Sequence, residues 1–239
     1  MLKAAFTEPD ARPTLEGWHA PDADGKPLAD TYAWEERRLG AMRDDLAGPI
    51  HYGWVPEDSL SISRSEARRV GLDELGYAAE PVAVRATGGT VVPQGAGTMN
   101  VTLFTRHRRH PGIRPFYEAW CEALREGFAE IGMKTTVGPC EGSFCDGDYN
   151  ILLDGKKLAG TAQRWSTARD GSSLGHHHAV IMLGGDPGTL CARVDALYRA
   201  AGLPDRADAN VHSDATLDID AVRRALRGPL DRLLDRNTL

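Results

Sequence analysis

The segment from Gly142 to Trp165 constrains the fold of this 239-residue chain more than any other part of it. Asp154-Gly155 is the strongest two-residue signal for a β-hairpin, and it separates two runs that favour strands, Tyr149–Leu153 and Lys156–Gln163. The sequence therefore predicts two antiparallel strands joined by a tight turn, with residues at equal distances from the turn facing each other.

The register of this hairpin sorts its side chains between two faces. A two-residue loop pairs Ile151 with Leu158, and alternate residues of a strand point to opposite faces. Gly160 thins the strand, which indicates that another group lies close to it. We expect Lys157 to lie on a face of small and polar residues, together with Asn150, Leu152, Ala159, Thr161 and Gln163.

Cys145 and Lys157 are the two residues of this segment that can take part in covalent chemistry. Cys145 precedes the hairpin, and a thiolate is a competent nucleophile for acyl transfer. A nearby ammonium group lowers the pKa of a thiol. The structural alternative is a small core cysteine and a solvated lysine. The loop must fold back for the two residues to meet, and Gly142 and Gly147 permit this.

The composition is that of an ordinary globular protein, with 41% hydrophobic and 26% charged residues. The formal net charge is -6 and no basic block occurs, which disfavours nucleic acid as a partner. The N-terminal segment lacks the apolar core of a secretory signal, and no apolar run reaches membrane-spanning length. We therefore expect a cytoplasmic protein with no membrane partner. We also expect a monomer, although the sequence itself leaves the oligomeric state open. The cysteines should be free thiols, and their spacing matches no zinc pattern.

Periodicity and breaker residues divide the rest of the chain into helices and strands in mixed order. We expect an irregular arm over residues 1–28, helices over 29–46, 65–75, 112–131, 187–201 and 219–234, and further strands over 50–55, 60–63, 81–85, 90–92, 101–104, 135–137 and 176–183. The strands 81–85 and 90–92 should form a hairpin, and residues 105–111 a basic surface loop. This order favours an α+β domain with a mixed, largely antiparallel sheet flanked by helices.

Four glycines between positions 88 and 97 exceed the needs of a single turn. Glycine lets backbone N–H groups approach a ligand closely. The spacing matches neither a Walker A loop nor the dinucleotide fingerprint. Two ordinary hairpin turns are an equal alternative to a ligand-binding loop.

Three adjacent histidines, residues 176–178, begin one of the expected strands. They suggest a metal site, but adjacent residues of a strand point to opposite faces, so all three cannot bind one ion. The sequence alone predicts no metal site.

Two motifs taken together resemble the catalytic domain of the biotin/lipoate protein ligase family, closest to lipoate-protein ligase A and the cysteine-dependent octanoyl/lipoyl transferases. Residues 85–89 and 95–100 resemble the family's Arg-x-x-Gly-Gly…Gly-x-x-Asn loop, and residues 154–163 resemble its lysine strand. The resemblance implies a class II synthetase-like fold. It implies a catalytic domain over residues 29–204, with a C-terminal loop and helix over 205–239 packed on it.

The resemblance also implies roles for individual residues. Lys157 matches the lysine that holds the acyl carbonyl in the family, and Cys145 resembles the nucleophile of the cysteine-dependent transferases. His178 matches a histidine often found at that place, and it is included among the substrate-binding residues. The other implied substrate-binding residues are Arg85, Thr87, Gly88, Gly89, Gly95, Gly97, Asn100, Gly160, Thr161, Ala162 and Gln163.

Three hypotheses for the activity follow from this resemblance. The first is transfer of an octanoyl or lipoyl group between lipoyl-carrier domains through a thioester on Cys145, which requires no cofactor. The second is an ATP- and Mg²⁺-dependent lipoate-protein ligase that uses Lys157 without a covalent cysteine intermediate. The third is a non-catalytic acyl-binding module. Two departures from the ligase pattern weaken the nucleotide-binding hypothesis: Val84 precedes Arg85, and residues 147–150 replace Arg-Asn-Asp.

Overall fold

Two β-sheets and the helices around them form the part of the chain that the computed structural model describes, residues 24–235. The larger sheet has the strand order β1-β5-β9-β8-β7-β6, and all its neighbouring strands are antiparallel. Its strands are β1 (Ile50–Trp54), β5 (Thr98–His107), β6 (Thr135–Gly138), β7 (Asn150–Leu153), β8 (Lys156–Thr167) and β9 (Ser173–Met182). The expected arm over residues 1–28 lies mostly outside the described residues.

The smaller sheet has the order β3-β2-β4, with β2 (Ser59–Ser63) between β3 (Val82–Arg85) and β4 (Val92–Gln94). Strand β2 pairs with β3 in parallel and with β4 antiparallel. The expected hairpin between residues 81–85 and 90–92 is therefore wrong. The connection has to cross the width of β2, and it is held as a wide loop because the Arg85 guanidinium donates to the carbonyl oxygens of Gly88 and Thr90.

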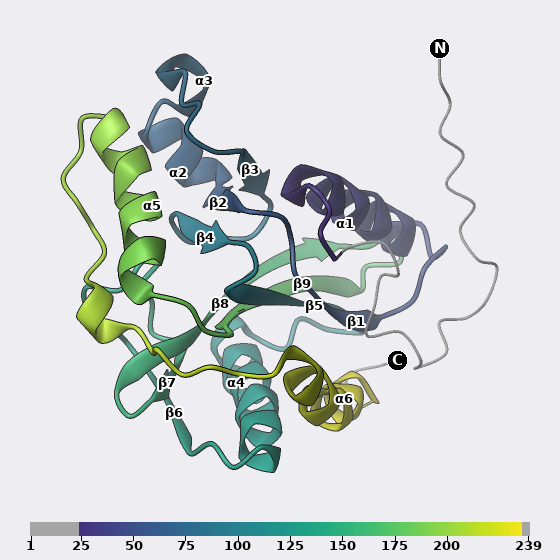
Figure 1. Ribbon diagram of the computed structural model, residues 1–239. Helices are drawn as coiled ribbons and strands as arrows, with labels where there is room; N and C mark the ends of the chain where they lie inside the picture. Colours follow the sequence, from purple (N-terminus) through teal and green to yellow (C-terminus); the bar gives the residue numbers. More distant parts are fainter. Residues whose placement is uncertain (1–23, 236–239) are drawn as a thin grey trace.

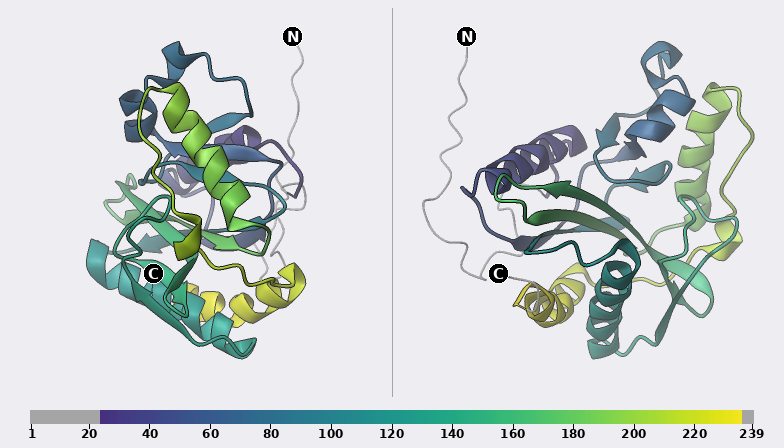
Figure 2. Two further views of the ribbon diagram at one scale, coloured as in Figure 1. Left: turned by 60° about the vertical axis from the view of Figure 1, so that its left-hand side comes forward. Right: turned by 180° about the vertical axis from the view of Figure 1, so that it is seen from behind.

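The helices divide between the two faces of the six-stranded sheet (Figures 1 and 2). Helices α4 and α6 cover one face, and α1 and the smaller sheet cover the other, with α2, α3 and α5 outside the smaller sheet. Their bounds are α1 Leu28–Arg43, α2 Arg64–Arg69, α3 Leu72–Leu75, α4 Ile113–Glu130, α5 Pro187–Ala200 and α6 Ile219–Asp235, and a short 3₁₀ helix, η1, spans Ala209–Val211. The expected helix over 65–75 is broken at Gly71, which has a left-handed φ of 63°. None of the described helices is long and apolar enough to cross a bilayer.

Side chains alternate strictly between the two faces of the central strands, so they join separate hydrophobic cores on the two sides of the sheet. Met99, Val101 and Leu103 of β5 join the core under α4 and α6, whereas Phe104 belongs to the core under α1. The same alternation divides the three adjacent histidines of β9. His177 stacks on Phe116 of α4 at 4.0 Å, while its two neighbours point to the opposite face, toward α1.

The expected hairpin is confirmed as β7 and β8, joined by Asp154-Gly155, and Leu152 pairs with Lys157 as predicted. The predicted pairing of Ile151 with Leu158 is wrong, because a register shift pairs Ile151 with Ala159. The shift adds a residue to β8, so both Ile151 and Leu158 remain fully buried in the core.

This register shift also changes the face on which Lys157 lies. The side chain of Lys157 passes Gly160, where an added Cβ would lie 3.2 Å from the lysine Cε. Gln163 instead donates to the Ile113 carbonyl at the start of α4, and Thr161 donates to the Tyr149 carbonyl. The predicted grouping of Lys157 with Thr161 and Gln163 on one face is therefore wrong.

The expected basic loop over residues 105–111 is wrong for its first three residues, which continue β5. His107 is buried and packs against Phe116 and Trp165. Arg106 pairs with Asp45 and Asp170. The side chains that pack on His107 and pair with Arg106 come from other segments of the chain. Because of these contacts, the polar segment forms the end of a covered strand and not a surface loop.

Candidate active site

The loop between β6 and β7 carries Cys145 and folds back over the start of β8. Its fold is fixed by Lys157, whose Nζ donates to the carbonyl oxygens of Phe144 at 2.6 Å and Cys145 at 2.9 Å, and to Ser143 Oγ at 3.4 Å. The lysine is 2% exposed, so its charge is placed against the loop backbone and away from water. All three ammonium hydrogens therefore have oxygen acceptors in the cysteine loop.

The sulfur of Cys145 lies against the connection between β3 and β4. The Thr90 N–H donates to Sγ at 3.2 Å, and Arg85 Nη2 lies 3.8 Å from the same sulfur. Cys145 has a φ of 50°, a left-handed conformation that costs energy for a residue with a side chain. Gly89 allows this close approach, because a Cβ at that position would lie 2.5 Å from Sγ.

Opposing effects set the pKa of the Cys145 thiol. Burial raises this pKa, but the charges of Arg85 and Lys157 and the Thr90 N–H lower it, and the net shift is downward. For the Lys157 ammonium group, burial lowers the pKa. By contrast, burial raises the pKa of Cys121 and that of Cys191 to about 12. Cys145 is thus set apart by its neighbours as a site where a thiolate is stabilised.

His212 braces the cysteine loop from the C-terminal side. Its Nε2 accepts the Phe144 N–H at 3.2 Å, and its ring stacks on the Phe144 ring at 4.2 Å. Its Nδ1 lies 2.8 Å from the Asp208 carbonyl oxygen, which requires the hydrogen on Nδ1 and leaves Nε2 as an acceptor. Burial lowers the pKa of His212 to about 4, so this neutral arrangement persists at neutral pH.

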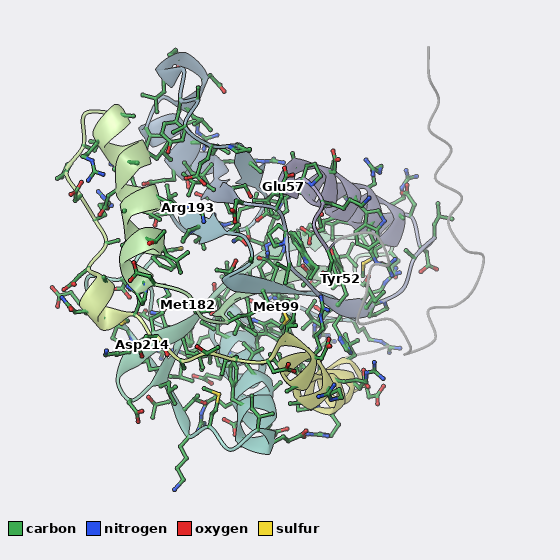
Figure 3. The ribbon with its side chains drawn as sticks, viewed as in Figure 1. Tyr52, Glu57, Met99, Met182, Arg193 and Asp214 are labelled. Atoms are coloured by element: carbon green, nitrogen blue, oxygen red, sulfur yellow. The ribbon has the colours of Figure 1, made fainter. Side chains whose placement is uncertain are left out.

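A narrow cavity lies between the two sheets beside the cysteine loop. Its volume is about 30 Å³, room for only a few water molecules. An eight-carbon chain therefore requires lining side chains to move, and Met182 (Figure 3) is a flexible one among them. The cavity is lined by Tyr32, Ser61, Arg85, Val92, Asn100, Phe144, Cys145, Lys157, Ala159, Gly160, Thr161, Ala162, His178, Val180 and Met182.

A wider hollow of about 290 Å³ lies along the same cysteine loop. Phe144 and Cys145 line both spaces, so the loop forms a partition between them. The wider hollow is lined by Thr90, Gly142, Ser143, Phe144, Cys145, Asp146, Val194, Tyr198 and Arg206. Cys145 therefore borders the wider hollow as well as the narrow cavity.

The structure brings most of the sequence-predicted site residues together. Those that line the narrow cavity are Arg85, Asn100, Cys145, Lys157, Gly160, Thr161, Ala162 and His178. Three others support this lining. Thr87 Oγ1 lies 3.0 Å from His178 Nδ1, the Gly88 carbonyl accepts from Arg85, and Gly89 adjoins the sulfur.

The three remaining predicted residues neither line the narrow cavity nor support its lining. Gly95 packs closely against Asp58, and a Cβ on Gly97 would lie 2.9 Å from the Gly184 carbonyl oxygen. Gln163 faces α4 on the opposite side of the sheet. The close packing of Gly95 and Gly97 explains why these positions carry glycine.

The sequence does not reveal two polar residues of the cavity lining that form a hydrogen-bonded chain with Arg85. Tyr32 of α1 and Ser61 of β2 both line the narrow cavity, and their hydroxyl groups lie 2.7 Å apart. Arg85 Nη1 donates to Ser61 Oγ at 3.1 Å. Neither residue belongs to a local motif, and only the packing of the smaller sheet on α1 brings them to the site.

A family profile described as the lipoyl protein ligase A/B catalytic domain matches residues 27–216 of the chain. This range contains the narrow cavity, the cysteine loop and His212. The match therefore covers all the residues of the candidate site described above.

Proteins related in sequence to this chain include the following two. The octanoyl-[GcvH]:protein N-octanoyltransferase of Kyrpidia tusciae is 32% identical over 157 residues, 64% of this chain and 53% of that protein. The chain thus spans about half the length of this curated relative. The uncharacterized protein H16_B0148 of Cupriavidus necator is 31% identical over 229 residues, 89% of this chain and 85% of that protein.

Solved structures share the fold. Protein Ta0514 from T. acidophilum with bound lipoic acid superposes with a TM-score of 0.63 and 19% identity, covering 89% of this chain and 86% of that one. Lipoate-protein ligase A bound with ATP has a TM-score of 0.60 and 21% identity, covering 89% and 86%. The expected α+β fold with a largely antiparallel sheet is confirmed. The chain belongs to the lipoyl protein ligase A/B catalytic domain family.

Proposed function

We propose that this protein transfers an octanoyl or lipoyl group to a lysine of a lipoyl-carrier domain through a thioester on Cys145. The observation that carries the proposal is the position of the Cys145 sulfur. It accepts the Thr90 N–H, lies 3.8 Å from Arg85 Nη2, and belongs to the lining of both the narrow cavity and the wider hollow. A stabilised thiolate beside an apolar cavity is what covalent acyl transfer requires.

The reaction consists of two acyl transfers. The Cys145 thiolate attacks the carbonyl carbon of the acyl-lysine on the donor carrier, a C–S bond forms, the C–N bond breaks, and the departing lysine nitrogen takes up a proton. The lysine amine of the acceptor then attacks the thioester carbonyl and loses a proton, and the thiolate returns. The Arg85 guanidinium and the Thr90 N–H are the donors nearest to the charge that develops at this centre.

In this proposal Lys157 positions the nucleophile and lowers its pKa. Its ammonium group already donates to the Phe144 and Cys145 carbonyl oxygens and to Ser143. This geometry supports a role in shaping the cysteine loop more directly than the role of holding the acyl carbonyl that the family resemblance implies. Gly160 leaves the space in which the Lys157 side chain lies.

The names of the relatives support carrier proteins as donor and acceptor. The Kyrpidia tusciae relative is named for an octanoyl group carried by GcvH and transferred to protein. On this basis the present chain takes its acyl group from one lipoyl carrier and delivers it to another without ATP.

The proposal is tested with an octanoylated GcvH-type carrier and an unmodified lipoyl domain, mixed with the protein in the absence of ATP. Intact mass of the acceptor should rise by one octanoyl group. Cys145→Ala should lower the rate by at least about 10³-fold, whereas Cys140→Ala, in the same loop region, should retain it.

A parallel reaction with free lipoate, ATP and Mg²⁺ distinguishes the ligase hypothesis. Acceptor lipoylation that depends on ATP and survives Cys145→Ala, with no carrier-to-carrier transfer, would overturn the proposal in favour of a ligase. Binding of octanoate without any acceptor modification would indicate an acyl-binding module.

A further inference from the structure

Three atoms of metal-ligand type converge in the interior between α1 and β9. Glu35 Oε2 lies 2.9 Å from His178 Nε2 and 3.3 Å from His176 Nε2, and the two nitrogens are 3.0 Å apart. None of the three side chains is more than 5% exposed. His176 and His178 are two apart in one strand and so share a face, and the carboxylate comes from the helix that covers that face.

The dimensions of this triangle suit a transition-metal ion. Its three corners lie about 1.8 Å from its centre, and zinc binds histidine nitrogen and carboxylate oxygen at roughly 2.0–2.2 Å. An ion at that distance would lie about 1 Å above the plane of the three atoms, with its remaining coordination position on the far side. The three donor atoms therefore already lie within reach of a common point.

Hydrogen bonds alone pair the three atoms of this triangle poorly. If only one of the two Nε2 atoms carries a hydrogen, the other turns a lone pair toward the Glu35 carboxylate oxygen. With two hydrogens, both N–H groups converge on the same oxygen while their nitrogens lie 3.0 Å apart. A cation accepts a lone pair from all three atoms and compensates the buried negative charge of Glu35.

The surrounding hydrogen bonds orient all three groups. Thr87 Oγ1 lies 3.0 Å from His178 Nδ1, so the ring can donate from Nδ1 to this oxygen and present Nε2 to an ion. Tyr52 Oη (Figure 3) and Thr102 Oγ1 each donate to Glu35 Oε1 at 2.7 Å, which leaves Oε2 for the ion. The His176 ring stacks on Phe104 with centroids 4.5 Å apart.

We propose that Glu35, His176 and His178 bind one divalent transition-metal ion, with Zn²⁺ the best match to two nitrogens and one oxygen in a buried site. Ca²⁺ and Mg²⁺ are poor matches because both prefer six or more oxygen ligands. The ion holds α1 against β9 and, through Thr87, holds the loop that carries Gly89 to the Cys145 sulfur. Its role is structural and does not depend on the acyl-transfer proposal.

The test begins with the full chain produced without a histidine tag, stripped with chelator, dialysed and loaded with Zn²⁺. Elemental analysis should find about one zinc per chain. Zinc should raise the thermal midpoint of the stripped protein by several degrees. Co²⁺ in place of Zn²⁺ should give the visible absorption of a nitrogen–oxygen site of low symmetry, and Mg²⁺ should leave the midpoint unchanged.

Single substitutions locate the ion within the chain. Glu35→Gln and His176→Asn should each lower zinc retention at least about tenfold. His177→Asn, in the same run of histidines but on the opposite face, should retain one equivalent. The proposal is overturned if the folded wild-type chain neither retains zinc nor gains stability from it, or if folded Glu35→Gln and His176→Asn both retain as much zinc as wild type. The wild-type titration alone decides the question if a variant fails to fold.

Discussion

At the scale of single residues, Cys145 shows how neighbouring charges can offset the effect of burial on the pKa of a thiol. Burial alone raises a thiol pKa, as it does for Cys121 and Cys191. The Arg85 guanidinium lies 3.8 Å from the Cys145 sulfur, and it is fixed in turn by Ser61 and by the carbonyl oxygens of its own loop. The charge of Arg85 therefore lowers the pKa of the Cys145 thiol more than the charge of Lys157 does. The sequence motifs do not show this difference.

The pH dependence of alkylation tests this view of Cys145. Because the folded pKa is lowered, the rate of iodoacetamide modification at Cys145 should rise with pH through an inflection below the ordinary thiol value of about 8.5. In Arg85→Gln the effect of burial remains while the main opposing charge is lost, so the inflection should move upward. Peptide mapping after timed alkylation measures the rate at each cysteine, and an unchanged inflection in Arg85→Gln would contradict the assignment.

The residue scale also marks the limit of sequence-based prediction of the site. Cys145, Lys157 and Arg85 could be identified because they lie in or beside local motifs. Tyr32 and His212 could not, since each reaches the site from a distant helix or loop, and their value depends on contacts that only the folded chain creates.

At the scale of elements, the local signals predicted local structure well. The Asp154-Gly155 turn joins β7 and β8 as expected, because the turn conformation depends on those two residues alone. The register shift at Ile151 was not predictable from the turn, since it serves to bury Leu158 in a core built by other elements. Likewise, no local signal shows that β2 lies between β3 and β4.

The connection between β3 and β4 offers a matched pair of glycines for testing the close approach to the sulfur. A Cβ on Gly89 would lie 2.5 Å from Cys145 Sγ, and Gly89 has a φ of 100°, whereas a Cβ on Gly88 would meet nothing within 4 Å. Gly89→Ala should therefore lower the alkylation rate of Cys145 and the transfer rate at least about tenfold.

Gly88→Ala serves as the control and should stay within about twofold of wild type. Single-turnover transfer and circular dichroism of both variants separate a local effect on the site from unfolding. Equal rates in Gly89→Ala and Gly88→Ala would show that this approach of the backbone is not needed.

At the scale of the whole molecule, the site lies where the two sheets meet, between separate hydrophobic cores. The core under α4 and α6 supports the six-stranded sheet. These two helices lie on the face of that sheet away from the smaller sheet (Figure 2). The core that contains Phe144 and Met182 joins the smaller sheet to α5. The cysteine loop is thus positioned by packing on one side and by Lys157 and His212 on the other.

Two helix glycines test how much the distant core contributes to stability. Gly127 of α4 lies against α6, and a Cβ there would lie 2.5 Å from Leu226 Cδ2 and 3.1 Å from its Cα. A Cβ on Gly40 of α1 would meet nothing within 4 Å. Gly127→Ala should therefore lower the free energy of unfolding by about 1–3 kcal/mol. Gly40→Ala should raise it by up to about 1 kcal/mol.

Urea unfolding of both variants measures these changes. The two changes in the free energy of unfolding should have opposite signs, because alanine favours a helix at both positions and only position 127 contacts α6. A stabilised Gly127→Ala would show that α4 and α6 are packed less closely than described here.

The central claim is that Cys145 forms a covalent bond to the acyl group, and intact mass spectrometry tests it most directly. The protein is mixed with an octanoylated carrier in the absence of an acceptor and quenched in acid. The account predicts one added octanoyl group, released by neutral hydroxylamine as expected of a thioester, mapped to the Cys145 peptide, and absent from Cys145→Ala. Carrier-to-carrier transfer at full rate with no acyl adduct on the protein, or with an equal adduct in Cys145→Ala, would contradict it.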